Sequence, residues 1–374
     1  MSVLDPNGAW LGRVDRPSIG PSLVTLRDGR VIDITSRAAA TVSDLLDLTD
    51  PAGYVRRAEG TDIGAEGDLG SDALPLLAPC DLQAVKACGV TFAGSMVERV
   101  IEERAAGDPD KAADIRARVG AAIGDSLADI VPGSDGAAKV KAALIAEGLW
   151  SQYLEVGIGP DAEVFTKAPV LSSVGHGAMV GLHPISKWNN PEPEVVLAVN
   201  ASGTIRGATL GNDVNLRDVE GRSALLLGKA KDNNASCAIG PMIRLFDEDF
   251  TLDTVRGLEL SLTVTGPEGF TLQGASRMAA ISRDPADLVA QTIGAHHQYP
   301  DGFMLFLGTL FAPTQDRFAP GAGFTHAVGD VVTISCPELG DLTNTVALSP
   351  DCPRWEFGIR AFMANLAGRG LIAG

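Results

Sequence analysis

From about residue 160 onward, the sequence consists of short β-type runs punctuated by glycine, which limits the chain to a fold built on sheets. The 43 glycines among 374 residues fit tight turns between such runs. Helical patterns of apolar residues occur earlier in the chain, around residues 41–48, 96–101 and 134–149. We therefore expect an α+β fold in which strands dominate the C-terminal two thirds. The strand-forming runs include VFTKAPV, EVVLAVN, TIRGATL, LELSLTVTG, GFMLFLGTLF and GDVVTISC.

Composition shifts along the chain predict two domains. Residues 1–75 are expected to form a small β-rich N-terminal subdomain, with an Asp28-Gly29 turn between two strands and a helix over 41–48. Within it, residues 50–74 are polar and glycine-rich and are expected to be a connector. Residues 76–374 would be the catalytic domain, with a helical insertion at about 104–150 that would act either as a lid or in oligomer packing.

Charge and cysteine content exclude several classes of protein. The 47 acidic and 30 basic residues give a net charge of −17, which disfavours nucleic acid and anionic membranes as partners. No apolar stretch approaches the roughly 18 residues of a membrane span. The five cysteines form no C-x-x-C pair, so neither a disulfide framework nor a zinc site is expected. Because the first residues lack the features of a signal peptide, we expect a cytoplasmic location.

The segment around Glu192 concentrates carboxylates at the start of a predicted strand. Pro191 and Pro193 favour extended backbone, so Glu192 and Glu194 point to the same face. A turn after residue 199 and a returning strand would bring Asp213 beside them. Three clustered carboxylates repel one another unless a hard cation neutralises them, and an all-oxygen set suits Mg²⁺ or Mn²⁺. The alternative is a solvated acidic rim at the strand start.

Several further motifs surround this segment in a fixed order. Phe165-Thr166-Lys167-Ala168-Pro169 precedes it, GNDVNLRD and KDNNASCAIGP follow it, and Gly308-Thr309 and Gly329-Asp330-Val331 come later. The ordered set resembles the fumarylacetoacetate hydrolase superfamily over about residues 80–350. Longer stretches, such as WNNPEPEVVL and HQYPDGFMLFLGTLFAP, resemble more closely its 2-keto-3-deoxy-D-xylonate and 2-keto-3-deoxy-D-arabinonate dehydratase branch.

The resemblance implies a mixed β-sheet roll of the fumarylacetoacetate hydrolase type and a homo-oligomer, a dimer or a tetramer. It also implies a Mg²⁺ site, with Mn²⁺ as the alternative ion, and an active-site lysine. A small-molecule 2-oxo sugar acid would be bound by basic and polar side chains, and His297 in HHQYPDG is either a further contact or a packed histidine. The implied metal ligands are Glu192, Glu194 and Asp213, the lysine is Lys231, and the implied substrate-binding residues are Arg217, Thr309, Lys167 and His297.

One departure from the superfamily pattern bears on the reaction. Hydrolases of the superfamily commonly carry a histidine where this chain has Ser95, whereas Glu98 is retained. A His–Glu pair can activate water, and serine alone cannot, so hydrolysis is disfavoured and elimination of water is favoured. Ser95-x-x-Glu98 also has the pattern of a capping box, which would give both residues a structural role.

The predicted reaction is Mg²⁺-dependent dehydration of a 2-keto-3-deoxy-pentonate to 2-oxoglutarate semialdehyde through a metal-stabilised enolate. The xylonate derivative is favoured, and the arabinonate derivative stays open. Lys231 would transfer the C3 proton, and Glu98 would protonate the leaving hydroxyl. The alternatives are a C–C bond hydrolase or decarboxylase of acylpyruvate-type 2,4-diketo acids, and an inactive scaffold with the same fold.

Overall fold

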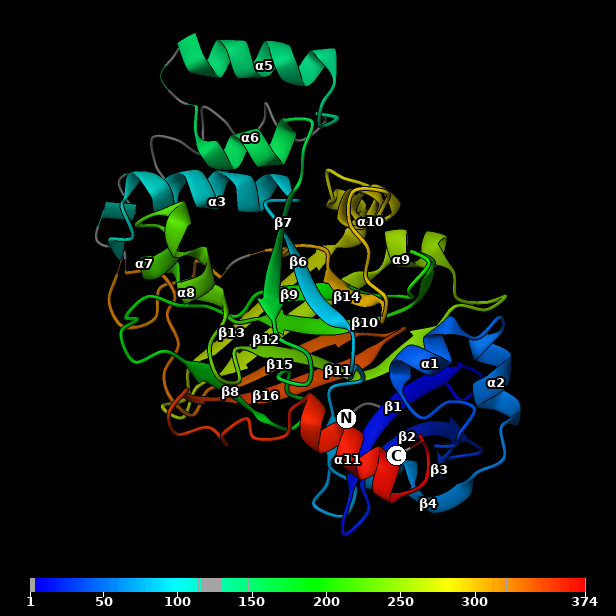
Figure 1. Cartoon of the computed structure of the whole chain (residues 1–374). Helices are drawn as coiled ribbons and strands as arrows, with labels where there is room; N and C mark the ends of the chain where they lie inside the picture. The colour runs from blue at the N-terminus through cyan, green and yellow to red at the C-terminus, as the bar shows by residue number, and fades with distance from the viewer. Residues whose placement is uncertain are drawn as a thin grey trace.

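Two β-sheets and a set of short helices make up the protein. A computed structural model describes residues 4–373 except 110, 113–114, 116–129, 147, 149, 312 and 321. Within these residues the strands form one sheet of eleven strands and a second sheet of five (Figure 1). Both sheets mix parallel and antiparallel pairs, because β14 runs parallel to β6 and β16 parallel to β8. The predicted α+β class is confirmed.

The larger sheet has the order β4-β3-β2-β1-β11-β10-β9-β14-β6-β7, and β5 pairs with β1. The antiparallel pairing of β1 with β11 makes the N-terminal strands continuous with the later ones. The strands are β1 Trp10–Arg16, β2 Gly20–Arg27, β3 Arg30–Asp33, β4 Thr61–Ala65, β5 Leu76–Leu77, β6 Ala84–Gly89, β7 Glu163–Ala168, β9 Pro193–Val199, β10 Ile205–Asp213, β11 Cys237–Leu245 and β14 Phe303–Phe306.

The central strands of this sheet are covered on both faces. Along β9, Val195 and Leu197 pack into one hydrophobic core, whereas Val196 and Ala198 pack into another. Successive side chains of a strand point to opposite faces, so a strand between two cores must be apolar throughout. This arrangement explains why the run from residue 195 to 199 shows no polar alternation, and it places the carboxylates that precede it inside the molecule.

The smaller sheet has the order β13-β12-β15-β16-β8 and buries one face. Burial alternates along β12, where Leu260, Leu262 and Val264 are buried and the residues between them are more exposed. This alternation is expected of a sheet with one solvated face. The strands are β8 Met179–Leu182, β12 Glu259–Thr265, β13 Thr271–Arg277, β15 Val331–Cys336 and β16 Gly340–Leu348.

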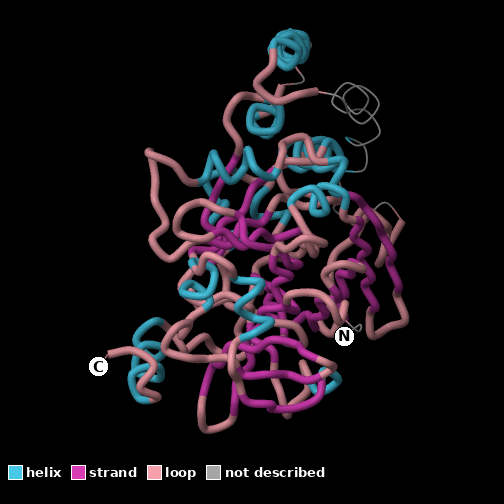
Figure 2. Tube along the Cα trace, turned by 90° about the vertical axis from the view of Figure 1, so that its right-hand side faces the viewer, coloured by secondary structure: helices cyan, strands magenta, loops and turns pink. Residues whose placement is uncertain are grey.

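Helices α3, α5 and α6 stack at the end of the molecule opposite the N-terminal strands (Figures 1 and 2). Their segment overlaps the predicted insertion at 104–150, much of which, including most of residues 113–129, lies outside the described residues. The helices are α1 Val42–Asp47, α2 Pro51–Arg57, α3 Ala93–Arg104, α5 Asp135–Ala146, α6 Gln152–Ile158, α7 Arg217–Glu220, α8 Leu227–Lys231, α9 Leu252–Gly257, α10 Pro285–Thr292 and α11 Ile359–Gly368. No helix in the described part of the chain is long and apolar enough to cross a membrane.

The N-terminal segment confirms one local prediction and corrects another. The Asp28-Gly29 turn joins β2 to β3, as the sequence predicts. The expected connector at 50–74 instead contains α2 and the edge strand β4. The overlooked signal is Asp50, whose carboxylate accepts a hydrogen bond from the backbone of Gly53 and caps a helix that begins with Pro51.

The C-terminus returns to the N-terminal strands. Asn365 of α11 and Arg369, the C-cap of this helix, donate hydrogen bonds to the carbonyls of Ile19 and Pro21, at 2.7 and 2.6 Å. The boundary at residue 75 therefore stays a prediction, since contacts and a shared sheet cross it. All five cysteines are buried free thiols.

Candidate active site

The β9–β10 hairpin brings three buried carboxylates together. Glu194 lies opposite Gly211 in the ladder, and the backbone N–H of Asp213 donates to the carbonyl of Glu192 at 3.1 Å. One carboxylate oxygen from each of Glu192, Glu194 and Asp213 lies within 4.8 Å of the others, and all three residues are buried. In the part of the chain that the structure describes, this is the single group of such side chains that could hold a metal ion.

Two lysines neutralise part of this negative charge. The ammonium group of Lys231 forms ion pairs with Glu192 and with Asp213, the latter at 3.0 Å. Lys167 approaches the other oxygen of Asp213 at 2.7 Å and also donates to the backbone carbonyl of Lys231. Burial opposes the charge of Lys231, but the attraction of Asp213 and Glu192 outweighs it and raises the pKa of the lysine.

Glu194 is the carboxylate least neutralised by the lysines, because both lysines pair with other carboxylates. Burial, and then repulsion from Asp213 and Glu192, raises the pKa of Glu194 well above its usual range. Its Oε2 accepts a hydrogen bond of 2.7 Å from the backbone N–H of Gly308. Gly308 has φ +98°, a conformation that side-chain-bearing residues rarely adopt. A divalent cation would relieve the repulsion, and the all-oxygen donor set fits Mg²⁺.

Helix α3 contributes a cation that the sequence did not single out. The guanidinium of Arg99 lies 2.5 Å from Glu192, 2.6 Å from Glu102 and 2.7 Å from Glu220, all between buried side chains. Arg217 pairs in turn with Glu102 at 2.6 Å. Glu192, one of the candidate metal ligands, is therefore paired with an arginine that also pairs with two further carboxylates.

These groups enclose a narrow cavity with about 20 Å³ open to the centre of a water molecule. That space suits an ion or a water molecule, so a sugar acid can enter only if the walls move. Six of the predicted site residues line the cavity, and no histidine does so among the described residues. The lining residues are Cys88, Gly89, Val90, Ser95, Arg99, Glu163, Phe165, Glu192, Glu194, Asp213, Glu220, Lys231 and Thr309.

Four other predicted site residues do not line the cavity. Lys167 and Arg217 are buried behind it, where they support Asp213 and Glu102. Glu98 pairs with Arg217 at 3.4 Å. His297 lies in an exposed turn with its ring against Tyr299. Because β14 begins opposite Val199, this turn lies at the end of β9 remote from Glu194.

The capping-box interpretation of Ser95 and Glu98 is wrong. Helix α3 begins at Ala93 with Phe92 as its N-cap, so Ser95 is the third helical residue and not the cap. The hydroxyl of Ser95 donates to the carbonyl of Phe92 at 2.8 Å and accepts from its N–H at 3.3 Å. Ser95 therefore ties the helix start to its own backbone while facing the cavity.

Glu163 is the second residue that sequence reasoning missed. It pairs with Gly89 across β6 and β7, and a Cβ at position 89 would collide with its carboxylate. Burial outweighs the attraction of Arg99 and Lys231 and raises the pKa of Glu163. Strand alternation places Glu163 on the same side of β7 as Phe165 and Lys167, and this signal was available in the sequence. For Arg99 the signal was its helical spacing from Ser95 and Glu102.

Comparison with known proteins gives a consistent family match. A family model described as fumarylacetoacetate (FAA) hydrolase C-terminal matches residues 160–347. A probable 2-keto-3-deoxyxylonate dehydratase of Haloferax volcanii is 31% identical over 194 residues, which cover 52% of this chain and 63% of the relative. A 2-dehydro-3-deoxy-D-arabinonate dehydratase of Saccharolobus solfataricus is 29% identical over 184 residues, 49% of this chain and 58% of the relative. The chain thus spans less than two thirds of the length of both relatives.

Solved structures share the fold over most of the chain. A 2-keto-3-deoxy-D-arabinonate dehydratase complexed with magnesium and 2,5-dioxopentanoate has a TM-score of 0.62 at 19% identity, covering 91% of this chain and 99% of that one. A fumarylacetoacetate hydrolase from Exiguobacterium antarcticum has a TM-score of 0.56 at 15% identity, with the same coverage of both chains. These structures confirm the predicted fold of the fumarylacetoacetate hydrolase type.

Proposed function

Because the chain belongs to the fumarylacetoacetate hydrolase family, we propose that it is a Mg²⁺-dependent dehydratase that converts a 2-keto-3-deoxy-pentonate into 2-oxoglutarate semialdehyde (2,5-dioxopentanoate). The observation that carries the proposal is a narrow cavity with three clustered carboxylates, a lysine and two further glutamates, and with no histidine among its described lining residues. A water-activating histidine is what C–C bond hydrolysis would need and dehydration would not. The two curated relatives are dehydratases of the same substrate class.

In this proposal Glu192, Glu194 and Asp213 hold Mg²⁺, or Mn²⁺ in its place. When bound, the ion supplies Lewis-acid polarisation of the 2-oxo acid, which makes the C3 proton more acidic. Lys231 now provides the positive charge between Glu192 and Asp213, so its ammonium group has to withdraw toward the substrate side when the cation binds.

The residues that face the cavity suggest a division of the proton transfers. Glu163 is placed to accept the C3 proton, because its carboxylate lines the cavity and has a raised pKa, which makes it a stronger base than an ordinary glutamate. Lys231 is placed to donate a proton to the departing C4 hydroxyl. Glu98 pairs with Arg217 outside this lining, so the cavity favours Glu163 and Lys231 for the two transfers.

Glu163 and Lys231 together can account for the protons transferred in the reaction. Removal of the C3 proton by Glu163 and protonation of the leaving C4 hydroxyl by Lys231 release one water molecule and leave a double bond between C3 and C4. A C5 proton then passes to Lys231 while the proton on Glu163 returns to C3, which gives the enol between C4 and C5. Tautomerisation of this enol moves its hydroxyl proton to C4. Both side chains regain their starting states, and C5 becomes the aldehyde.

Thr309 is suited to hold the substrate through its hydroxyl group, whereas the guanidinium of Arg99 is already paired with three carboxylates. The Thr309 hydroxyl now donates to the carbonyl of Phe311 at 2.9 Å and can exchange that partner for a substrate oxygen. Arg217 and Lys167 would act from behind the cavity by fixing Glu102 and Asp213. The role predicted for His297 finds no support in its exposed position.

The test is product formation from the D and the L form of 2-keto-3-deoxy-pentonate, which differ at C4. With Mg²⁺ we expect release of 2,5-dioxopentanoate, loss of activity with a chelator, and recovery with Mg²⁺ or Mn²⁺. Release of pyruvate and a carboxylic acid from an acylpyruvate would support the hydrolase alternative instead. Absence of turnover on every substrate, with metal bound, would support the inactive scaffold.

A homo-oligomer, a dimer or a tetramer, is part of the proposal. Large apolar side chains such as Leu225 and Phe318 are exposed on the single chain, as is common where subunits meet. Light scattering of the purified full chain would measure the state, and a monomeric mass would contradict this part of the proposal.

A further inference from the structure

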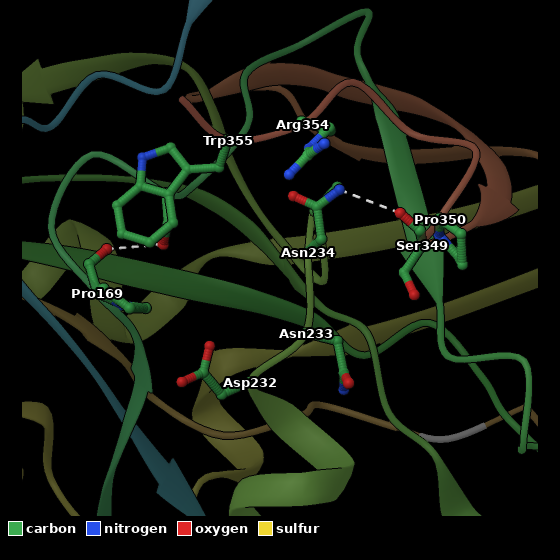
Figure 3. Close-up of a pocket in the computed structure, with 10 residues that line it drawn as sticks. Pro169, Asp232, Asn233, Asn234, Ser349, Pro350, Arg354 and Trp355 are labelled. Carbon is green, nitrogen blue, oxygen red and sulfur yellow. Dashed lines mark hydrogen bonds between the residues drawn. The ribbon is translucent and has the colours of Figure 1, made fainter. Parts of the chain in front are cut away.

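A second, more open pocket lies between the loop that follows Lys231 and the segment that precedes α11 (Figure 3). It has about 570 Å³ open to the centre of a water molecule, within the range of small-molecule sites. Its lining shares no residue with the carboxylate cavity. The lining residues are Pro169, Ser172, Asp232, Asn233, Asn234, Ala235, Ser349, Pro350, Arg354 and Trp355.

The pocket has one aromatic wall and one free cation. The indole of Trp355 stands at one side of the opening (Figure 3), and the residue is 47% exposed. Arg354 next to it forms no ion pair with any residue that the structure describes, and its guanidinium extends over the pocket (Figure 3). A bare guanidinium beside an aromatic face is suited to a carboxylate attached to an apolar or C–H surface.

The opposite side of the pocket offers hydrogen-bond acceptors. The side-chain N–H groups of Asn234 donate to the carbonyls of Ser349 and Pro353, at 3.0 and 3.1 Å. These two bonds fix the amide so that its oxygen faces the pocket, and the carboxylate of Asp232 points into the same space (Figure 3). Acceptors of this kind bind hydroxyl groups, and Asp232 disfavours a ligand that carries several negative charges.

We propose that this pocket binds an open-chain polyhydroxylated monocarboxylate of about the size of a pentonate. Arg354 binds the carboxylate, Trp355 covers the C–H face of the chain, and Asn234 and Asp232 accept from the hydroxyl groups. The chemical class follows from the pocket itself and does not depend on the reaction proposed above. The site lies outside the carboxylate cavity and needs no metal.

The proposal is tested by calorimetric titration of the full chain with D-xylonate and with xylitol, in the presence of a chelator. D-xylonate has a carboxylate and no 2-oxo group, and xylitol is the matched polyol without charge. We expect D-xylonate to bind more tightly, and Arg354→Gln to weaken D-xylonate binding about tenfold while leaving xylitol binding unchanged. Trp355→Ala should weaken the binding of both ligands.

The matched control is Arg360→Gln, which removes an exposed arginine of the same C-terminal region that does not line this pocket. It should leave the binding of both ligands unchanged. Three results would overturn the proposal: no binding of D-xylonate, equal loss in the Arg354 and Arg360 variants, or binding that is insensitive to both Arg354→Gln and Trp355→Ala.

Discussion

Two buried clusters of charged residues in this protein contain similar side chains but differ in the balance of positive and negative charge. Around Asp330, Arg317 forms two contacts of 2.6 Å with the carboxylate, and Nδ1 of His326 lies 2.8 Å from it. Around Glu194, several carboxylates share two lysines and one arginine. The side chains of Arg317 and Asp330 are both fully buried, and so, nearly, are those of Glu192 and Asp213.

The pKa values express the difference. Burial opposes the charge of Asp330, but hydrogen bonds from Arg317 and His326 outweigh it and lower its pKa to about 2. At Glu194 nothing outweighs burial and the neighbouring carboxylates, and the pKa is raised. The charges around Asp330 neutralise one another, whereas the surplus negative charge around the carboxylate cavity would favour a bound cation. Asp330 belongs to a family-like motif, and its role here is structural.

The largest expected effect is that of Glu194→Gln. We expect loss of the proposed dehydratase activity by about 10³-fold or more, because one of the three proposed metal ligands is altered. The free energy of unfolding should stay the same or rise, because the substitution removes like-charge repulsion and keeps an acceptor for the N–H of Gly308. Turnover with saturating Mg²⁺ and urea unfolding under a chelator measure the two effects. A variant that is inactive because it is unfolded would contradict the comparison.

Asp330→Asn should show the opposite pattern. It leaves the fully buried guanidinium of Arg317 without its neutralising partner, which we expect to lower the free energy of unfolding by about 3 kcal/mol. The Mn²⁺ affinity of the folded variant should equal that of the wild type, because Asp330 lies outside the metal-ligand group. Urea unfolding measures the change in stability, and a Mn²⁺ titration measures the metal affinity. If metal affinity fell together with stability, the two clusters would not be independent.

Arg99→Gln tests the link between a positioning residue and the metal ligands. Because Arg99 orients Glu192, its loss should weaken Mn²⁺ binding about 10- to 100-fold, with electron paramagnetic resonance of Mn²⁺ as the readout. The matched control is Arg104→Gln, on the same helix, whose side chain donates to the carbonyl of Gly148 at the surface. Equal effects of the two substitutions would assign Arg99 a role in helix stability alone.

The sequence could predict the site residues that lie on strands, but not where the residues on helices and turns lie relative to the cavity. Strand alternation and a hairpin suffice to bring Glu192, Glu194 and Asp213 together, because both rules act over short stretches of chain. The positions of Glu98 and His297 depend on how helix α3 and the turn before β14 pack against the sheet, which a linear motif does not encode. Glu163 faces the cavity because Gly89, far away in sequence, leaves room for its carboxylate.

The smallest expected effect is a pH dependence of stability that separates the two clusters. The folded-state pKa of Asp330 lies near 2, below the ordinary 3.8, so its stabilising contribution is complete above pH 4 and is lost as the pH falls toward 2. The difference in free energy of unfolding between wild type and Asp330→Asn should therefore narrow by about 1 kcal/mol between pH 6 and pH 3. Urea unfolding of both proteins at each pH cancels the titration of the other carboxylates. A constant difference would show that Arg317 and His326 do not hold Asp330 ionised, and the contrast with Glu194 would then lose its electrostatic basis.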